Sequence, residues 1–178
     1  MSVSEIAAIT ARNTPVNLFP RPEHDHDSCV DLAVERAQEI CAAKDIRLTP
    51  LRRAVLKVLL SSHKALGAYD IIEKLGRDGR RLAPISVYRI IEVLLAAGLV
   101  HRLESRNAYF ACLSEHGDSK STVMLICDEC GRVAETQAPE AWDAIKSITQ
   151  SSGFAVSDTV LEIQGICADC RKPPGGKP

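Results

Sequence analysis

The sequence predicts an α+β protein of two domains, an N-terminal winged helix-turn-helix domain followed by a smaller α/β domain. Three observations support this fold class. Segments with helical periodicity come first and end in a short two-stranded hairpin. The last third of the chain shows the order strand, strand, helix, strand. Two C-x-x-C pairs bracket that second region, and a length of 178 residues suits two small domains.

Four helices are predicted in the first domain, which we expect over residues 29–113. Thr49 and Pro50 mark one start, because threonine caps the free N–H groups of a helix and proline fits its first position. The four segments are residues 30–43, 49–62, 68–79 and 84–98. The first three are predicted to bury Ala33, Ala37, Ile40 and Cys41; Leu51, Val55, Val58 and Leu59; and Ile71, Ile72 and Leu75.

The fourth helix has a buried side and an outer side. Arg89 points away from the apolar cluster on a helical wheel, and Ser86 flanks the outer face. Two extended stretches follow at residues 99–104 and 108–113, with a turn at 105–107. Helices followed by such a hairpin are typical of a winged helix, whose last helix contacts DNA. The predicted buried set is Val87, Ile90, Ile91, Leu94 and Leu95.

The charge distribution agrees with a nucleic-acid partner. The net charge is −1, but residues 44–106 hold 13 Lys/Arg against 6 Asp/Glu, a balance of +7. An ordinary solvated surface would give the same composition, so the charge alone leaves both interpretations open. The accompanying winged-helix pattern favours double-stranded DNA.

The second domain is expected over residues 122–171, after a polar hinge at 114–121. Strands are predicted at residues 122–126, 133–136 and 154–166, and a helix at 138–151 with Ala141, Ile145 and Ile148 inward. Residues 1–28 and 172–178 are predicted to be flexible tails. The His/Asp/Cys-rich stretch at residues 24–29 is either part of that tail or a loose metal-binding segment.

Seven cysteines occur, an odd number that argues against a disulfide framework. Cys41 lies on an apolar helical stripe and is predicted to be a core residue. No apolar run is long enough for a membrane span and no secretion signal is visible, so we expect a cytoplasmic protein without a membrane partner. Two turns with paired thiols can complete a tetrahedral structural zinc site, whereas a redox C-x-x-C does not need two pairs. Its predicted ligands are Cys127, Cys130, Cys167 and Cys170.

A second site with mixed ligands is possible from the residues alone. His101 lies in the first strand of the hairpin, Cys112 ends the second, His116 lies in the hinge and Glu135 lies in the second domain. Together they could form a four-coordinate site that bridges the domains, in which a thiolate favours zinc over ferrous iron. The alternative is that His101 is a surface residue and Cys112 a small core residue.

Five motifs follow one another along the chain: Leu48-Thr49-Pro50-Leu51-Arg52, Gly67-Ala68-Tyr69-Asp70, Ser86-Val87-Tyr88-Arg89, Asn107-Ala108-Tyr109 and Ile126-Cys127-Asp128-Glu129-Cys130-Gly131. Through these motifs the sequence resembles the ferric-uptake-regulator (Fur) superfamily of metal-dependent repressors over roughly residues 30–170. Within it, the chain most resembles the zinc-uptake-regulator branch, through Ala68-Tyr69-Asp70 and the order of His101, Cys112 and His116. The iron and peroxide branches tend to carry a His-rich cluster where this chain has Thr122-Val123-Met124-Leu125.

The resemblance implies a homodimer in which the second domain is the dimerisation domain. It implies two Zn²⁺ ions per monomer: a structural ion at the four paired cysteines and a regulatory ion at His101, Cys112, His116 and Glu135. His116 stands only four residues after Cys112, so another hinge group or a water is the alternative ligand. The expected activity is zinc-dependent repression of zinc uptake genes at an AT-rich palindromic operator. The expected DNA contacts are Tyr69, Ser86, Tyr88 and Arg89, with Arg52, Arg53, Lys64 and Arg81 on phosphates.

Three other interpretations remain as hypotheses. A Fur-type repressor sensing iron, manganese or peroxide would have the same fold, but Cys112 argues against it. A zinc store or chaperone would use the His/Asp-rich segment, but would leave the basic winged helix unexplained. An enzyme is not expected, because no H-E-x-x-H, Gly-rich phosphate loop or Ser/His/Asp pattern is present.

Overall fold

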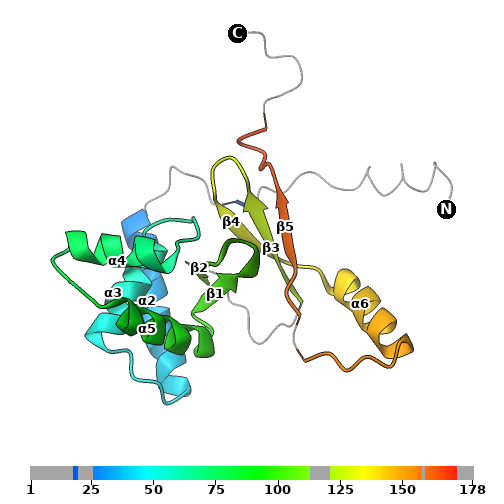
Figure 1. The fold of residues 1–178 in the computed structure, drawn as a ribbon, viewed down its shortest axis with the longest axis horizontal. Helices are drawn as coiled ribbons and strands as arrows, with labels where there is room; N and C mark the ends of the chain where they lie inside the picture. Colours follow the sequence, from blue (N-terminus) through cyan, green and yellow to red (C-terminus); the bar gives the residue numbers. More distant parts are fainter. Residues whose placement is uncertain (1–17, 20–25, 113–120, 158, 172–178) are drawn as a thin grey trace, which may run out of the picture.

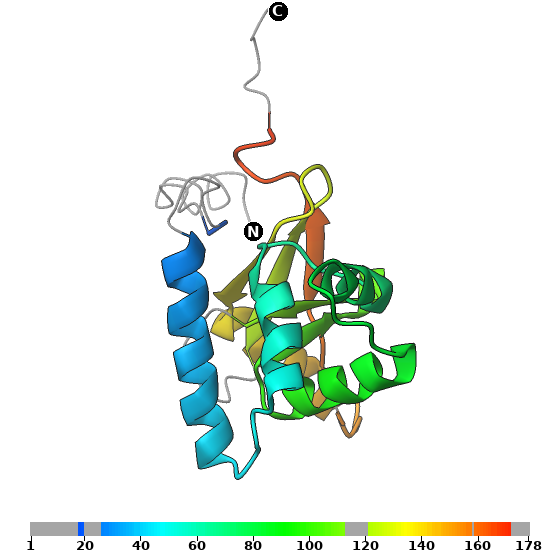
Figure 2. The ribbon, with the colours of Figure 1, turned by 90° about the vertical axis from the view of Figure 1, so that its left-hand side faces the viewer.

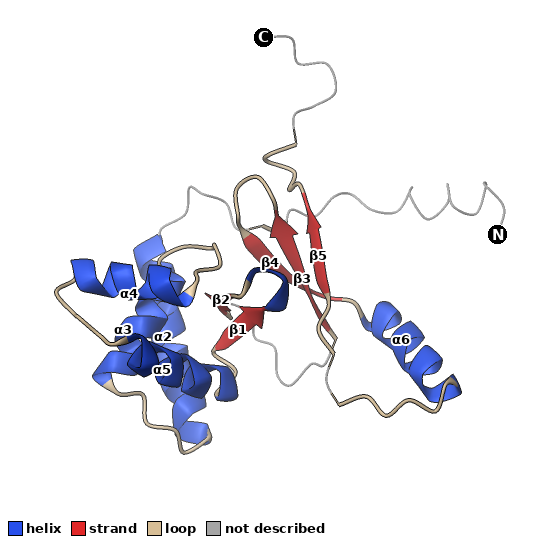
Figure 3. Cartoon of the chain, in the orientation of Figure 1, coloured by secondary structure: helices blue, strands red, loops and turns tan. Residues whose placement is uncertain are grey.

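The computed structural model describes residues 18–19, 26–112, 121–157 and 159–171. Its elements follow the predicted order and confirm the α+β fold class (Figures 1 and 3). Within these ranges, no helix is long and apolar enough to cross a membrane. The elements are α2 (His26–Ala43), α3 (Pro50–Leu60), α4 (Ala68–Arg77), α5 (Pro84–Ala96), β1 (Val100–Leu103), a 3₁₀ turn η1 (Glu104–Arg106), β2 (Ala108–Ala111), β3 (Thr122–Cys127), β4 (Val133–Gln137), α6 (Pro139–Ser151) and β5 (Glu162–Gly165).

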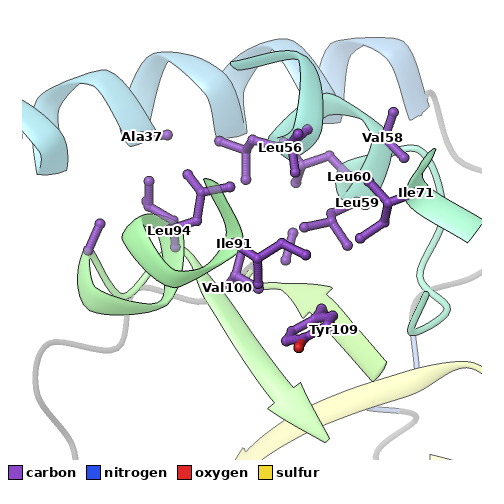
Figure 4. Close-up of a cluster of buried hydrophobic side chains, with 14 of the residues drawn as sticks. Ala37, Leu56, Val58, Leu59, Leu60, Ile71, Ile91, Leu94, Val100 and Tyr109 are labelled. Atoms are coloured by element: carbon purple, nitrogen blue, oxygen red, sulfur yellow. The ribbon is translucent and has the colours of Figure 1, made fainter. Parts of the chain in front are cut away.

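The four helices of the first domain share one aliphatic core. The Thr49 hydroxyl accepts a hydrogen bond from the Arg52 N–H and caps α3, as predicted. Cys41 is 2 % exposed, which confirms it as a core residue. Figure 4 shows Leu56, Leu59, Ile91 and Leu94 meeting in this core, and Figure 2 shows α2 running alongside α3.

Three details of these helices differ from prediction. The first helix begins at His26, four residues before the expected start. Leu51 is 41 % exposed, whereas Leu56 and Leu60 are buried although they were not expected to be. Leu56 and Leu60 are buried because α3 contacts α2, α4, α5 and β2, so it buries a wider face than one apolar stripe.

The hairpin and the second sheet are connected by a short extended segment between α3 and α4, residues 63–66. Leu66 exchanges two backbone hydrogen bonds with Tyr109 of β2, each 2.8 Å. On the other side, Lys64 pairs with Arg132, and the Val133 N–H donates to the His63 carbonyl. Backbone hydrogen bonding therefore runs from β1 through β2 and residues 63–66 to β4. The hairpin and the second sheet are consequently joined by backbone hydrogen bonds.

The second sheet has the order β4-β3-β5, in which β3 pairs antiparallel with β4 and parallel with β5. The predicted strand at residues 154–166 is wrong in extent, since among its described residues only Glu162–Gly165 form a strand. Phe154, Val156 and Val160 alternate like a half-buried strand but are 46–67 % exposed. An alternating pattern indicates a strand with one buried apolar face. The described residues of this sheet do not bury the apolar side chains of this segment.

The predicted inward face of α6 is also wrong. Ala141 and Ile148 are exposed, Ile148 by 67 %, while the buried side chain of this helix is Trp142. Figure 1 shows α6 projecting beyond the edge of the sheet rather than covering it. Among the residues that the structure describes, no surface covers Ile148 on this helix.

Candidate metal centres and nucleic-acid interface

The four paired cysteines meet because of the sheet topology. Cys127 ends β3, and Cys167 comes two residues after β5. Since β3 and β5 are parallel, their C-terminal ends lie at the same edge of the sheet, and each continues into a tight turn. Gly131, with φ +70°, completes the first turn in a left-handed conformation that favours glycine. Sulfur atoms of Cys127, Cys130, Cys167 and Cys170, the four-cysteine cluster, lie within 4.8 Å of one another.

The ionisation of these thiols is uneven. Burial alone would raise the pKa of Cys127, but the backbone N–H groups of Cys130 and Cys167 lower it to about 6. The pKa of Cys170 is raised to about 12, first by its hydrogen bond with Cys167 and then by burial. Four thiols at this spacing do not all ionise readily without a cation. A divalent ion with a preference for tetrahedral sulfur ligands, such as Zn²⁺, fits this donor set.

Arg132 contacts the same cluster and has no counterpart in the predicted site. It is 9 % exposed, and its guanidinium donates to Sγ of Cys130 (3.2 Å) and Sγ of Cys167 (3.5 Å). It also donates to the Asp169 carboxylate at 2.7 Å. Burial would raise the pKa of Cys130, but hydrogen bonds from the side chain and the backbone of Arg132 together lower it. The sequence gives one hint of this contact, which is that a charged residue stands directly before the predicted strand at residues 133–136.

The second cluster lies between the two domains. His101 Nε2 is 3.0 Å from a carboxylate oxygen of Glu135, and Cys112 Sγ is 3.7 Å from the other. A donor atom from each of the three residues lies within 4.8 Å of the other two, and we call them the mixed cluster. The His101 ring also packs against Phe110, with centroids 5.5 Å apart. The fourth predicted ligand, His116, lies outside the described residues.

The charge of the mixed cluster is set by His101. Burial would lower the pKa of His101, but hydrogen bonds with Cys112 and Glu135 raise it to about 9. Its imidazole therefore carries a proton at neutral pH, in the place where a metal ion would put its own positive charge. A sulfur, a nitrogen and an oxygen donor at this separation fit zinc.

Three further contacts fix the hairpin against the second sheet. Leu103 and Phe110 share a buried apolar cluster with Met124, Ile126 and Val133. The Glu162 carboxylate accepts hydrogen bonds from the backbone N–H groups of Glu104 (2.7 Å) and Ser105 (3.1 Å) in η1. Arg106 of the same turn forms an ion pair with Asp128, at 2.7 Å, inside the first C-x-x-C turn. Nothing in the sequence pointed to these polar contacts, because the partners are 22 to 58 residues apart.

The predicted DNA contacts fall into two groups. Tyr69, the second residue of α4, is 72 % exposed, and Tyr88 and Arg89 are exposed on α5 with Ser86 half-buried. Arg81 is exposed just before α5, so it lies beside this surface. Arg52 and Arg53 are half-buried on α3, and the Arg52 guanidinium donates to the Arg47 carbonyl at 2.6 Å. Lys64 lies at the junction with the second domain.

A winged helix is a DNA-binding fold. Here its hairpin and the small sheet together supply a cluster of side chains that could hold a metal ion. This combination defines the class of metal-binding, DNA-binding proteins. The chain belongs to the ferric uptake regulator family, whose sequence pattern it matches over residues 43–164.

Relatives and solved structures agree with this assignment. The zinc uptake regulation protein of Escherichia coli (strain K12) is 36 % identical over 135 residues, which cover 76 % of this chain and 79 % of the relative. The peroxide-responsive repressor PerR of Staphylococcus aureus (strain Mu50 / ATCC 700699) is 28 % identical over 134 residues, covering 71 % and 83 %. A zinc uptake regulator complexed with zinc and DNA superposes with a TM-score of 0.74 at 35 % identity, covering 79 % of this chain and 94 % of that one. The crystal structure of holo XcZur gives a TM-score of 0.68 at 34 % identity, covering 77 % and 95 %.

Proposed function

We propose that this protein is a zinc-responsive DNA-binding repressor of zinc uptake genes in the cytoplasm, with zinc as the corepressor. The observation that carries the proposal is the mixed cluster, because its donors come from both domains. His101 and Cys112 belong to the hairpin, whereas Glu135 belongs to β4. The thiolate favours zinc over ferrous iron. The zinc uptake regulation protein and the zinc- and DNA-bound regulator described above support the same effector.

The arrangement suggests how metal would control the orientation of α5. The hairpin follows α5 directly, so a constraint on β1 is transmitted to the helix that contacts DNA. A zinc ion held by His101, Cys112 and Glu135 would connect the two domains, because its ligands come from both. The four-cysteine cluster would hold the other ion. The ligands would then bind zinc more tightly when DNA is bound, because such coupling is reciprocal.

A second copy of this chain is the partner that the exposed apolar face fits. Ile148 on α6, Phe154, Ile163 on the edge strand β5 and Ile166 are 54–67 % exposed. An exposed edge strand and an uncovered apolar helix face are stabilised when they pair with an equivalent surface. A two-fold dimer would place two α5 helices in successive major grooves, about 34 Å apart, on a palindromic AT-rich site.

On DNA, Arg89 would contact bases and the more peripheral cations would contact phosphates. Arginine bonds guanine O6 and N7 through two parallel N–H groups. Tyr69 and Tyr88 offer an apolar face to a thymine methyl, and Ser86 offers a hydroxyl. Arg52, Arg53, Lys64 and Arg81 would make the affinity dependent on salt without adding sequence preference.

The test combines metal content with DNA binding. The protein is purified without added metal, its zinc is counted, and zinc is then titrated against a palindromic AT-rich duplex in a competing chelator. We expect one retained zinc per monomer and DNA binding that rises as a second site fills. Glu135→Gln should keep the retained zinc and lose the zinc-dependent step, whereas the exposed control Glu140→Gln should behave as wild type.

Other outcomes would contradict the proposal. DNA binding that follows iron or manganese but not zinc would place the protein with repressors of another effector. Zinc binding without DNA binding under any metal would instead support a storage role.

A further inference from the structure

Arg132 is a buried charged residue, and its surroundings are unusual. Its side chain reaches both cysteine turns, with Cys130 on one side and Cys167 and Asp169 on the other. Its backbone carbonyl accepts from the Cys127 N–H at 2.9 Å, so the same residue also closes the first turn. Arg132 therefore contacts three of the four cysteines of the cluster. Its side chain contacts Cys130 and Cys167, and its backbone contacts Cys127.

The charge balance of the four-cysteine cluster requires a neighbour of this kind. Four thiolates around one divalent ion leave two negative charges, and Cys127 and Cys167 are at most 5 % exposed. A buried charge is costly unless an opposite charge compensates it. The guanidinium supplies one positive charge against these two, and its planar fork of N–H donors reaches acceptors on both turns, whereas the donors of a lysine ammonium all lie on one atom.

We propose that Arg132 is a positioning residue of the four-cysteine cluster, where it holds the sulfur atoms of Cys130 and Cys167 in place and slows the release of zinc. Asp169 completes the arrangement, because its carboxylate orients the guanidinium at 2.7 Å. This inference rests on the proposed occupancy of the cluster by zinc. An ordinary buried ion pair between Arg132 and Asp169 would stabilise the fold equally but would not change the environment of the sulfur atoms.

The experiment measures how fast zinc leaves the full-length dimer into an excess of a chromophoric chelator. The variants are Arg132→Met, which removes the charge, and Arg132→Lys, which keeps the charge but loses the planar fork of donors. Arg171→Met is the matched control, since Arg171 is exposed and lies next to Cys170. Wild type must first show one retained zinc, and its absence would count against the proposed function rather than against the role of Arg132.

We expect Arg132→Met to release zinc about 10- to 100-fold faster than wild type, the usual range for groups that orient metal ligands. Arg132→Lys should lie between the two, and Arg171→Met should match wild type. The cobalt-substituted Arg132→Lys protein should also show shifted thiolate absorption bands. Equal release rates and equal spectra in wild type and Arg132→Lys would overturn the proposal, as would equal acceleration by Arg171→Met.

A second variant keeps the test decisive if Arg132→Met does not fold. Asp169→Asn leaves Arg132 in place and removes only the charge that orients it. We expect zinc release faster than wild type, with an unchanged dimer by sedimentation. A release rate equal to that of wild type in both Asp169→Asn and Arg132→Lys would refute the proposal.

Discussion

Arg89 projects from the exposed face of α5, while Val87 and Ile91 on the other face are at most 1 % exposed. The buried residues fix the helix, and the helix fixes the direction of Arg89. We expect Arg89→Ala to remove about 1–3 kcal/mol of discrimination between the operator and unrelated DNA, because the base contacts are lost. Gel-shift titrations on both duplexes measure this difference.

Arg81→Ala is the matched comparison for Arg89→Ala. It removes the same charge from the segment just before α5, where we expect only phosphate contacts. Both duplexes should then be bound more weakly by a similar factor, and the salt dependence should fall by about one unit of slope. If Arg89→Ala also weakened both duplexes equally, its base-contacting role would be wrong.

The raised pKa of His101 leads to a second prediction at this scale. A histidine must lose its proton before it binds a metal, and the pKa of His101 is about 9 in the metal-free cluster. Below that pH, the apparent affinity of the second zinc should fall about tenfold per pH unit from this proton alone. Chelator competition from about pH 8.5 to about pH 6.5 measures it. A pH-independent affinity would exclude His101 as a ligand.

At the scale of elements, the 3₁₀ turn η1 is held by Glu162 of the neighbouring sheet. Burial would raise the pKa of Glu162, but hydrogen bonds from Ser105 and Glu104 lower it. The charged contact is therefore fully present at neutral pH and is lost as the pH falls through the lowered value. We expect Glu162→Gln to cost on the order of 1 kcal/mol, after allowance for solvent screening.

Amide hydrogen exchange localises this effect. The N–H groups of Glu104 and Ser105 should exchange faster in Glu162→Gln at neutral pH, because each loses a charged acceptor. Gln164→Ala on the same strand is the control, since Gln164 is exposed. Unchanged protection of both amides in Glu162→Gln would show that the turn does not depend on β5.

The elements that local chemistry determines were predictable, and those that depend on distant partners were not. The Thr49 cap and the α5 apolar stripe arise from neighbours along the chain, so sequence alone located them. The four-cysteine cluster followed from two fixed spacings. Glu162 contacts residues 57 and 58 positions away, and Arg132 contacts Cys167, 35 positions away, and no local period encodes such pairs. His116 stays a prediction, since it lies outside the described residues.

At the scale of the whole molecule, two of the errors of the sequence analysis concern neighbouring exposed segments. The apolar face of α6 and the alternating segment at residues 154–160 were both expected to be buried, and both are exposed. Both patterns are typical of segments that bury apolar side chains. In the described part of the single chain, no surface covers these side chains. The errors therefore indicate where a second copy would pack.

Ile148→Glu tests this explanation of the exposed face. The charge should oppose burial of α6 in a dimer, so sedimentation should show monomers at concentrations where wild type is dimeric. Leu32→Glu is the control, because Leu32 on α2 is likewise 67 % exposed and its substitution introduces the same charge. The Ile148→Glu monomer should keep its retained zinc but bind the palindrome with an affinity near that of a single half-site, since both α5 helices must be held at one spacing. A variant that stays dimeric, or equal dissociation by Leu32→Glu, would mean that another surface joins the two copies.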